Sequence, residues 1–234
     1  DRPALLAPGT VVRFRRVDAL QPASEHAPVS ERPDAAAGSL LVVDPGFATT
    51  IQDGGRPGFA ASGLGRAGAV DRAALEHVNR LVGNPPGAAV LETAGGVHLE
   101  AAAALVIADS QSGTVQTLRV GERLRFTART DGAWWYIAVR GGIDATAVLG
   151  SRSRDTMATL GPEPPRAGDV LAIGREPPAS LIGDVVPLRR RIDDAVRISF
   201  GPRDDWFTAE SRRALIDQEW VIGGERSRIG VRLG

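Results

Sequence analysis

The chain has 234 residues, of which 43% are hydrophobic and 24% charged, and its 28 basic and 28 acidic side chains leave no net charge. This length and this apolar share are sufficient for one or two domains with a buried core. We expect neither a nucleic-acid partner nor a membrane span, because there is no basic excess and no apolar run long enough to cross a bilayer.

The N-terminal part alternates between strand and linker patterns. Residues 1–17 contain a turn that leads into an alternating strand, Pro8–Phe14. Residues 18–39 are rich in Ala, Pro, Ser and Glu without any period, which is typical of a linker. A strand from Leu40 to Val43 follows, and glycine and turn residues then dominate the chain to about Gly65.

The best helix candidate runs from Val70 to Val82. Asp71 suits its N-cap, and an apolar stripe of the kind that faces a core follows it: Leu75, Val78, Leu81 and Val82. The helix should end at the run Gly83–Pro86, because proline cannot continue a helix and glycine suits the C-terminal cap.

The remainder of residues 40–175 is expected to be β structure. Short alternating segments separated by glycine turns are typical of a barrel or a sandwich. They are Ala89–Glu92, Val97–Glu100, Ala104–Ala108, Val115–Leu118, Arg123–Ala128, Trp134–Val139 and Val170–Ile173. Of the adjacent Trp134 and Trp135, one should face the core and the other the surface.

The C-terminal part is expected to begin a second β domain. Residues 176–194, rich in Pro, Arg and Asp, are interpreted as a second linker. Residues 195–234 then offer a strand from Val196 to Phe200 and a helix from Thr208 to Ile216, which Thr208 could cap. This second domain is incomplete within the sequence.

The absence of lysine and cysteine limits the reactions and binding sites that this sequence can support. All basic residues are arginine, and without lysine the segment forms no Schiff base, carries no lysine-linked biotin and has no P-loop lysine. It has no cysteine, and its only histidines (His26, His77 and His98) lack metal-binding helical spacing, so we expect no metal site. With no cysteine and no secretory signal at the N-terminus, we expect a cytoplasmic location.

The densest polar motif is Thr49–Phe59. Its glycines allow tight turns, and Gln52, Asp53 and Arg56 add an amide, a carboxylate and a guanidinium. Arginine binds a carboxylate or carbamate with two hydrogen bonds, and aspartate serves as a base or orients a donor. An equally good interpretation is a structural turn in which the Asp–Arg pair only ties the loop together.

Two further motifs carry polar groups. Gly63–Asp71 enters the helix, where free N–H groups suit an anion, but Asp71 already satisfies some of them and a plain cap is favoured. In Val139–Asp144 a strand ends in a glycine pair, and the loop Leu149–Thr156 then follows with two serines, two arginines and an aspartate. Such loops bind phosphate in many folds, while a solvated connection is the alternative.

These motifs, in their order along residues 40–234, resemble allophanate hydrolase subunit 2 of the biotin-dependent carboxyltransferase family. The resemblance rests on segments that span both expected domains: Thr50–Gly58, Arg66–Asp71, Leu81–Ala88, Glu92, Arg140–Ile143, Leu149–Thr156, Gly201–Phe207 and Ser227–Leu233. It implies a mainly β protein of tandem cyclophilin-like β-barrels with a few short helices, the second barrel being incomplete here. The chain departs from the family pattern at Gly54, Ala67 and Val70, and it lacks the family's C-terminal Thr-Thr-Gly-Gly run.

The resemblance also implies a partner of the allophanate hydrolase subunit 1 type. Residues 1–17 resemble the closing strand of that partner, which would make this chain part of a fusion; alternatively they are a leader of this subunit. The implied enzyme is heteromeric and ATP-dependent and acts on an amide or lactam, with 5-oxoprolinase leading. The alternatives are the carboxyltransferase of a urea carboxylase/allophanate hydrolase system, a non-catalytic regulator that binds a kinase inhibitor, and a plain structural domain.

The implied site is one wall of a cleft that faces the partner subunit. Its expected catalytic residues are Asp53, Arg56 and Asp155. Its expected substrate-binding residues are Gln52, Arg66, Asp71, Arg140, Gly141, Ser151, Arg152 and Ser153. ATP is used by the complex and is not expected to bind this segment alone, and biotin belongs only to the carboxyltransferase alternative, on another domain.

Overall fold

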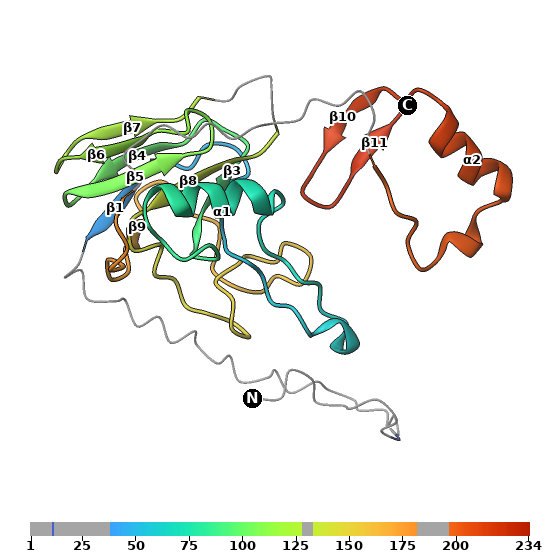
Figure 1. Ribbon diagram of the computed structural model, residues 1–234, viewed down its shortest axis with the longest axis horizontal. Helices are drawn as coiled ribbons and strands as arrows, with labels where there is room; N and C mark the ends of the chain where they lie inside the picture. Colours follow the sequence, from blue (N-terminus) through green and yellow to red (C-terminus); the bar gives the residue numbers. More distant parts are fainter. Residues whose placement is uncertain (1–10, 12–37, 128–132, 182–196) are drawn as a thin grey trace, which may run out of the picture. The chain divides into compact units, whose positions relative to one another are not determined.

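The computed structural model describes Val11 and residues 38–127, 133–181 and 197–234 (Figure 1). The strand expected within residues 1–17, the 18–39 linker except its last two residues, and much of the 176–194 linker lie outside the described residues. The chain divides into two compact units, Asp1–Leu188 and Arg189–Gly234.

The larger unit contains two antiparallel sheets. One has the strand order β7-β4-β1-β9 and the other β2-β3-β8-β5-β6. The strands of the first are β1 (Ser39–Asp44), β4 (His98–Ala101), β7 (Arg123–Arg125) and β9 (Val170–Ala172). Those of the second are β2 (Thr50–Gln52), β3 (Val90–Thr93), β5 (Leu105–Asp109), β6 (Val115–Leu118) and β8 (Trp135–Val139).

The main core lies between the two sheets. Because alternate residues of a strand point to opposite faces, Trp135, Ile137 and Val139 of β8 all join Leu40 of β1 and Leu99 of β4 in one buried cluster. The residues between them on β8 point the other way and are buried as well. The five-stranded sheet is therefore covered on both faces.

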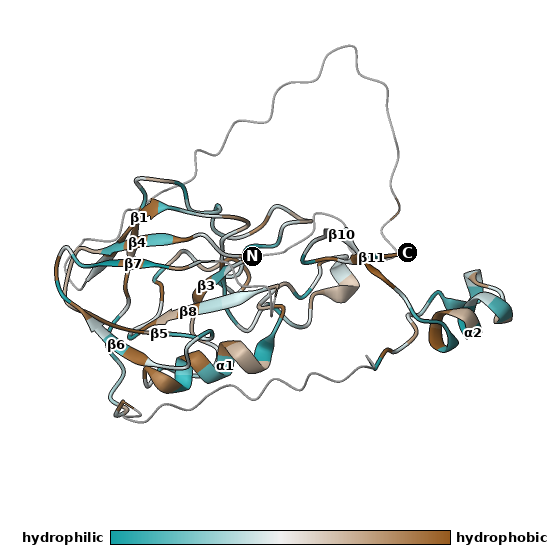
Figure 2. Ribbon diagram, turned by 90° about the horizontal axis from the view of Figure 1, so that it is seen from above, coloured by the Kyte–Doolittle hydropathy of each residue, from teal (hydrophilic) through white to brown (hydrophobic). Residues whose placement is uncertain are grey.

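Helix α1 (Arg72–Leu81) covers the outer face of the five-stranded sheet, against β8 and β5. Its apolar stripe, which includes Leu75 and Val78, packs against Tyr136 and Ala138 of β8. Figure 2 shows the resulting layers, with α1 beside β5 and β8 and the sheet of β1, β4 and β7 beyond them. Asp71 caps the helix by accepting a hydrogen bond from the backbone N–H of Ala74 at 2.9 Å.

The smaller unit has a helix and a hairpin. The short 3-10 helix η2 (Asp204–Trp206) precedes α2 (Ala209–Asp217), which Thr208 caps by accepting from the backbone N–H of Ser211. Strands β10 (Ile222–Arg226) and β11 (Val231–Leu233) pair antiparallel. Among the described residues of this unit, no hydrophobic side chain is buried.

The mainly β class is confirmed, as are the helix capped by Asp71, the helix capped by Thr208 and the contrast between buried Trp135 and partly exposed Trp134. The strand expected at Val196–Phe200 is wrong over its described part, because residues 197–200 are exposed and pair with no other strand. Strand β2 was not foreseen, since its three residues lie within a run of turn formers. No helix in the described part of the chain has the length and apolar character to cross a membrane.

Candidate functional site

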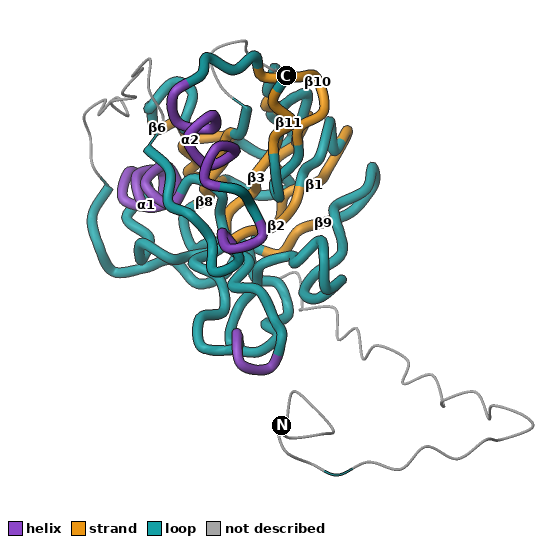
Figure 3. The backbone as a smooth tube through the Cα atoms, turned by 90° about the vertical axis from the view of Figure 1, so that its right-hand side faces the viewer, coloured by secondary structure: helices purple, strands orange, loops and turns teal. Residues whose placement is uncertain are grey.

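Two loops that lie far apart in sequence meet beside strand β2. The backbone N–H of Arg154 donates to the carbonyl of Ile51 at 3.0 Å, and Nε2 of Gln52 donates to the carbonyl of Arg154, 102 residues away, also at 3.0 Å. Figure 3 shows how much of the larger unit outside its sheets is made of such loops. The fold thus brings the first polar motif, Thr49–Phe59, against the Leu149–Thr156 motif.

The carboxylate of Asp53 is the centre of this junction. Its Oδ1 accepts from the backbone N–H of Gly55 and the hydroxyl of Ser151, each at 2.7 Å, and from the hydroxyl of Ser153. Its Oδ2 accepts from the backbone N–H of Arg152 at 2.6 Å. A buried carboxylate that accepts from four donors is held in place, so this geometry suits a positioning residue better than a base.

Arg56 lies in the same junction and is fully buried. Its Nη2 donates to the carbonyl of Ser153 at 2.6 Å and its Nε to the carbonyl of Val148 at 3.3 Å. Its Nη1 stands 3.9 Å from Oδ2 of Asp155. We define the side chains of Asp53, Arg56, Ser151, Ser153 and Asp155 as the hub.

The loop that follows Gln52 closes over the hub through its backbone. The N–H of Arg56 donates to the carbonyl of Arg66 at 2.7 Å, which brings the two ends of the intervening loop together. Gly55, with φ +82°, is required here, because a side chain would begin 2.6 Å from that same carbonyl. The side chain of Arg66 is exposed, and that of Arg152 is partly exposed and ion-paired to Asp144 at 3.0 Å.

The structure places Arg140 and Gly141 elsewhere. The guanidinium of Arg140 donates to the carbonyl of Val82 at the end of α1 and to the carbonyls of Pro177 and Ala179. The N–H of Gly141 donates to Oδ1 of Asn84. These contacts tie the end of α1 to the segment that follows β9 and involve no hub residue, so a single wall containing Arg140 and the hub stays a prediction.

A second buried polar group was not identified from the sequence. Oε2 of Glu92 accepts from the hydroxyl of Tyr136 and from the backbone N–H of Val70, each at 2.8 Å, and the Tyr136 hydroxyl accepts from the N–H of Asp71. Burial, and next the negative charge of Glu92, raise the pKa of Tyr136 well above its usual value. Glu92 stands among the residues that carry the family resemblance and is a glutamate within an otherwise apolar strand pattern, but no role was predicted for it.

Backbone strain gathers around the hub. Among the described residues, the non-glycine residues in the left-handed region are Ala48, Ala67, Leu149 and Thr159, with φ between 52° and 55°. Each belongs to a segment next to β2 or to one of the loops that meet there. Strained backbone of this kind persists only where the surroundings hold it, and it is commonly found at functional sites.

Neither a metal site nor an ATP site is assigned to the described residues. They contain no group of three or more histidine, cysteine or acidic side chains that could hold a metal ion. The glycine-rich segment before α1 does not fit a triphosphate, because the carboxylate of Asp71 already occupies the helix N-terminus and there is no lysine. Nucleotide binding is therefore not assigned to these residues.

Comparison with known proteins gives consistent relatives. Residues 62–234 match the family described as carboxyltransferase domain, subdomain A and B. The C subunit of 5-oxoprolinase from Escherichia coli strain K12 is 32% identical over 211 residues, covering 83% of this chain and 68% of that protein. Urea amidolyase of Lachancea kluyveri is 29% identical over 232 residues, covering 82% of this chain and 12% of that protein.

Solved structures agree with these relatives. The crystal structure of TTHA0988 has a TM-score of 0.74 and 33% sequence identity, and the match covers 86% of this chain and 43% of that one. The K. lactis urea amidolyase structure has a TM-score of 0.67 and 27% identity, covering 83% of this chain and 14% of that one. The chain therefore spans less than half the length of either solved protein.

Proposed function

This chain belongs to the family of carboxyltransferase domains, subdomains A and B, and on that basis we propose that it is a subunit of a 5-oxoprolinase. In this proposal a heteromeric, ATP-dependent complex hydrolyses the cyclic amide bond of 5-oxoproline to give glutamate. The chain contributes one face of the active site, and a protein of the allophanate hydrolase subunit 1 type contributes the other.

The observation that carries the proposal is the match to the C subunit of 5-oxoprolinase. The Escherichia coli subunit is 32% identical to this chain, against 29% for the urea amidolyase of Lachancea kluyveri, and the match extends over 68% of the bacterial subunit, compared with 12% of urea amidolyase. We therefore favour a subunit of similar extent to the bacterial C subunit over a small part of a much longer enzyme.

The residue types of this chain support a complex in which one subunit binds the nucleotide and this chain binds the amide substrate. The chain has no lysine, and its described glycine loops are closed by their own carboxylates, so nucleotide binding falls to another subunit. What this chain offers an amide substrate is arginine and carboxylate chemistry at the hub. We assign Arg56 and Asp155 to substrate contact and Asp53 to holding the loops, with the exposed Arg66 and Arg152 available to a substrate carboxylate.

A carboxyltransferase in a urea carboxylase system is the second candidate. It is favoured by the family description and by the urea amidolyase match, which covers 82% of this chain. Biotin would then be carried by another domain, since this sequence has no lysine to which it could be attached. A regulatory subunit that binds its partner without chemistry is the third candidate, and a cytoplasmic location is proposed for all three.

The deciding experiment is reconstitution. The chain is co-purified with its subunit 1 type partner and the remaining subunit, and glutamate is measured after addition of ATP and 5-oxoproline. Parallel reactions supply urea with a biotinylated carrier. Glutamate formation supports the proposal; carboxylation without glutamate favours the second candidate, and a stable complex without either product favours the third.

Two substitutions test the site in the same assay. Arg56→Ala and Arg152→Ala are each expected to lower turnover at least tenfold, because each removes a guanidinium assigned to the substrate. Arg166→Ala, on an exposed turn away from the hub, is the matched control and should leave turnover unchanged. Unchanged turnover in both Arg56→Ala and Arg152→Ala would exclude this site.

A further inference from the structure

One ion pair in the hub is unusual for a buried pair. Arg56 and Asp155 have side chains that are 0% and 8% exposed, yet Nη1 and Oδ2 stand 3.9 Å apart, beyond hydrogen-bonding distance. Among the described residues, Nη1 is a buried donor without a hydrogen-bond partner, although the other two nitrogens of the same guanidinium are bonded to carbonyls. Buried charged groups normally satisfy such donors, so this one calls for an explanation.

The two oxygens of the Asp155 carboxylate also differ in their hydrogen bonds. Oδ1 of Asp155 accepts from the backbone N–H groups of Met157 and Ala158, each at 3.0 Å, which fixes the orientation of the carboxylate. Oδ2 accepts no hydrogen bond among the described residues and is directed toward Arg56. Each side chain is thus anchored by part of its polar atoms and leaves one atom for something else.

Gly65 lies beside one of these two atoms. A β-carbon placed on Gly65 would lie 3.8 Å from Oδ2 of Asp155, in van der Waals contact with it, so this position brings backbone without a side chain to the carboxylate. Gln52, whose Nε2 donates to the carbonyl of Arg154 in the same junction, has a further buried atom without a hydrogen-bond partner among the described residues, Oε1. The junction therefore holds buried unsatisfied atoms on both Arg56 and Gln52.

We propose that Nη1 of Arg56 and Oδ2 of Asp155 form a receptor for the edge of an amide. The guanidinium donates to the amide oxygen, and the carboxylate accepts from the adjacent N–H on the same side. A lactam ring and urea both present a carbonyl beside an N–H in this arrangement, whereas a carboxylate ligand would face repulsion from Asp155. The inference rests on the proposed function in that both candidate enzymes act on such a group.

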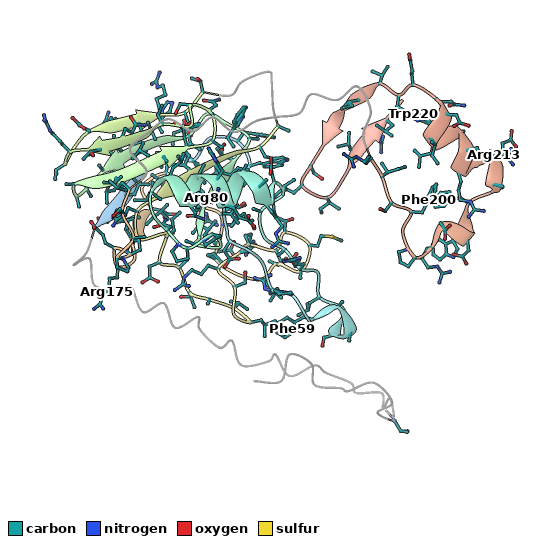
Figure 4. The ribbon with its side chains drawn as sticks, viewed as in Figure 1. Phe59, Arg80, Arg175, Phe200, Arg213 and Trp220 are labelled. Carbon is teal, nitrogen blue, oxygen red and sulfur yellow. The ribbon has the colours of Figure 1, made fainter. Side chains whose placement is uncertain are left out.

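In this inference, the loop that precedes Gly65 supplies the route of entry to the pair. Residues 57–64 are described in full, and the backbone hydrogen bonds found for them join Phe59 to Ser62 and Leu64, and Ala60 to Gly63, all within the loop. We name this segment the flap; it carries the 3-10 helix η1 (Ala60–Ser62) and projects from the larger unit in Figures 1 and 3. Phe59 is labelled in that projection in Figure 4.

The flap hinges on a defined base. Below it, the Arg56 to Arg66 backbone hydrogen bond closes the loop, and Ala67 with φ 52° holds strained backbone beside it. Gly58 and Gly63 have nothing within 4 Å of where a β-carbon would be, so no neighbour restrains them. In this inference, outward movement of residues 57–65, which include Gly65 beside Oδ2 of Asp155, gives a ligand access to the pair.

The test measures the binding of four small probes, which differ in their amide groups, to the full chain in its complex. Binding is detected by shifts in the NMR signals of the Arg56 side-chain Nε–H and of the backbone at residues 65–66 and 155–158. The probes are 2-pyrrolidinone, its N-methyl derivative, 5-oxoproline and urea. We expect 2-pyrrolidinone to shift these signals and its N-methyl derivative, which lacks the N–H, to bind at least tenfold more weakly. Equal binding of the two, or the absence of a shift with every probe, would overturn the proposal.

A matched pair of variants sharpens the result. Asp155→Asn keeps an oxygen for the Met157 and Ala158 N–H groups but replaces the free acceptor with a donor, and we expect at least a tenfold loss of 2-pyrrolidinone binding. Asp169→Asn alters a similar exposed turn, where Asp169 accepts from the N–H of Arg166, and should bind normally. If Asp155→Asn does not fold, the probe series on the unaltered chain decides alone.

The outcomes separate this inference from the proposed function. Probe binding without glutamate production sustains the receptor and removes the 5-oxoprolinase proposal, while glutamate production without probe selectivity does the reverse. Selective shifts with 5-oxoproline assign the receptor to a lactam, and shifts with urea assign it to the carboxyltransferase candidate. A crystal structure in which only a water bridges Arg56 and Asp155, and no probe displaces it, would overturn the inference.

Discussion

The two units of this protein have similar kinds of secondary structure but very different packing. In the larger unit, side chains from both sheets meet in one core and α1 closes a second cluster on the outer face. In the smaller unit, α2 is capped and β10 pairs with β11, yet Phe200, Trp206 and Ile222 are 45%, 72% and 64% exposed. Capped helices and paired strands are thus not sufficient for a domain; opposed apolar faces are required.

The largest expected effect comes from separating the units. A fragment of residues 38–181 should fold with a cooperative unfolding transition, whereas residues 197–234 should remain unfolded alone, because the described part of the smaller unit buries no hydrophobic side chain. Circular dichroism with urea titration of both fragments measures this. A cooperative transition in the smaller fragment would show that the comparison is wrong.

Substitution of a single leucine in each unit should show the same difference in packing, with a smaller effect. Leu99→Ala, at a position 0% exposed, is expected to lower the free energy of unfolding of the whole chain by about 2–5 kcal/mol. Leu233→Ala, at a position 41% exposed, should lower it by less than about 1 kcal/mol. Urea denaturation of the two variants makes the comparison, and equal losses would contradict it.

Within the larger unit, Asp53→Asn separates a positioning role from a catalytic one. Asparagine has one acceptor oxygen, so it cannot serve the donors on Oδ1 and the N–H of Arg152 on Oδ2 together, and we expect a loss of about 1–3 kcal/mol in unfolding free energy. The exposed Asp144→Asn is the control in the same denaturation assay. Lost turnover with unchanged stability would instead identify Asp53 as a base.

The smallest expected effect is a dependence on alkaline pH. Tyr136 is the only tyrosine, and the chain has no lysine or cysteine, so it is the only side chain that titrates near pH 10. Because the pKa of Tyr136 is raised in the folded state, the protonated hydroxyl contributes its full stabilisation at pH values below the usual tyrosine pKa of 10.0. Above that pH the unfolded state loses the proton first, and unfolding free energy should fall by about 1.4 kcal/mol per pH unit.

The variant Tyr136→Phe provides the control for this titration. It should be less stable at neutral pH, since Glu92 and the N–H of Asp71 lose their partner, but its stability should no longer fall between pH 10 and 11. Denaturant unfolding of both proteins across this pH range measures the difference. An identical alkaline decline in the two proteins would show that Tyr136 is not its source.

Features that depend on near neighbours were predictable from the sequence. The α1 stripe, its Asp71 cap and its end before Pro85 follow from residues three or four apart, and the strands of the larger unit follow from alternation. Strand β2 was missed because Gln52 is followed by turn residues, and its strand conformation comes from pairing with β3. The Val196–Phe200 prediction failed for the opposite reason: an apolar run with no partner strand remains unpaired.

The amino-acid sequence by itself determined the mainly β class, both capped helices and a chemistry limited to arginine, carboxylates, amides and hydroxyls. Only the tertiary structure decided that Asp53 serves the loop at Ser151–Ser153, that Arg140 serves the end of α1, and that Glu92 bonds Tyr136. The reason is that these contacts join residues from 44 to 98 positions apart. Local periodicity does not record which distant donor a buried acceptor will meet, because the folding of the sheets sets that choice.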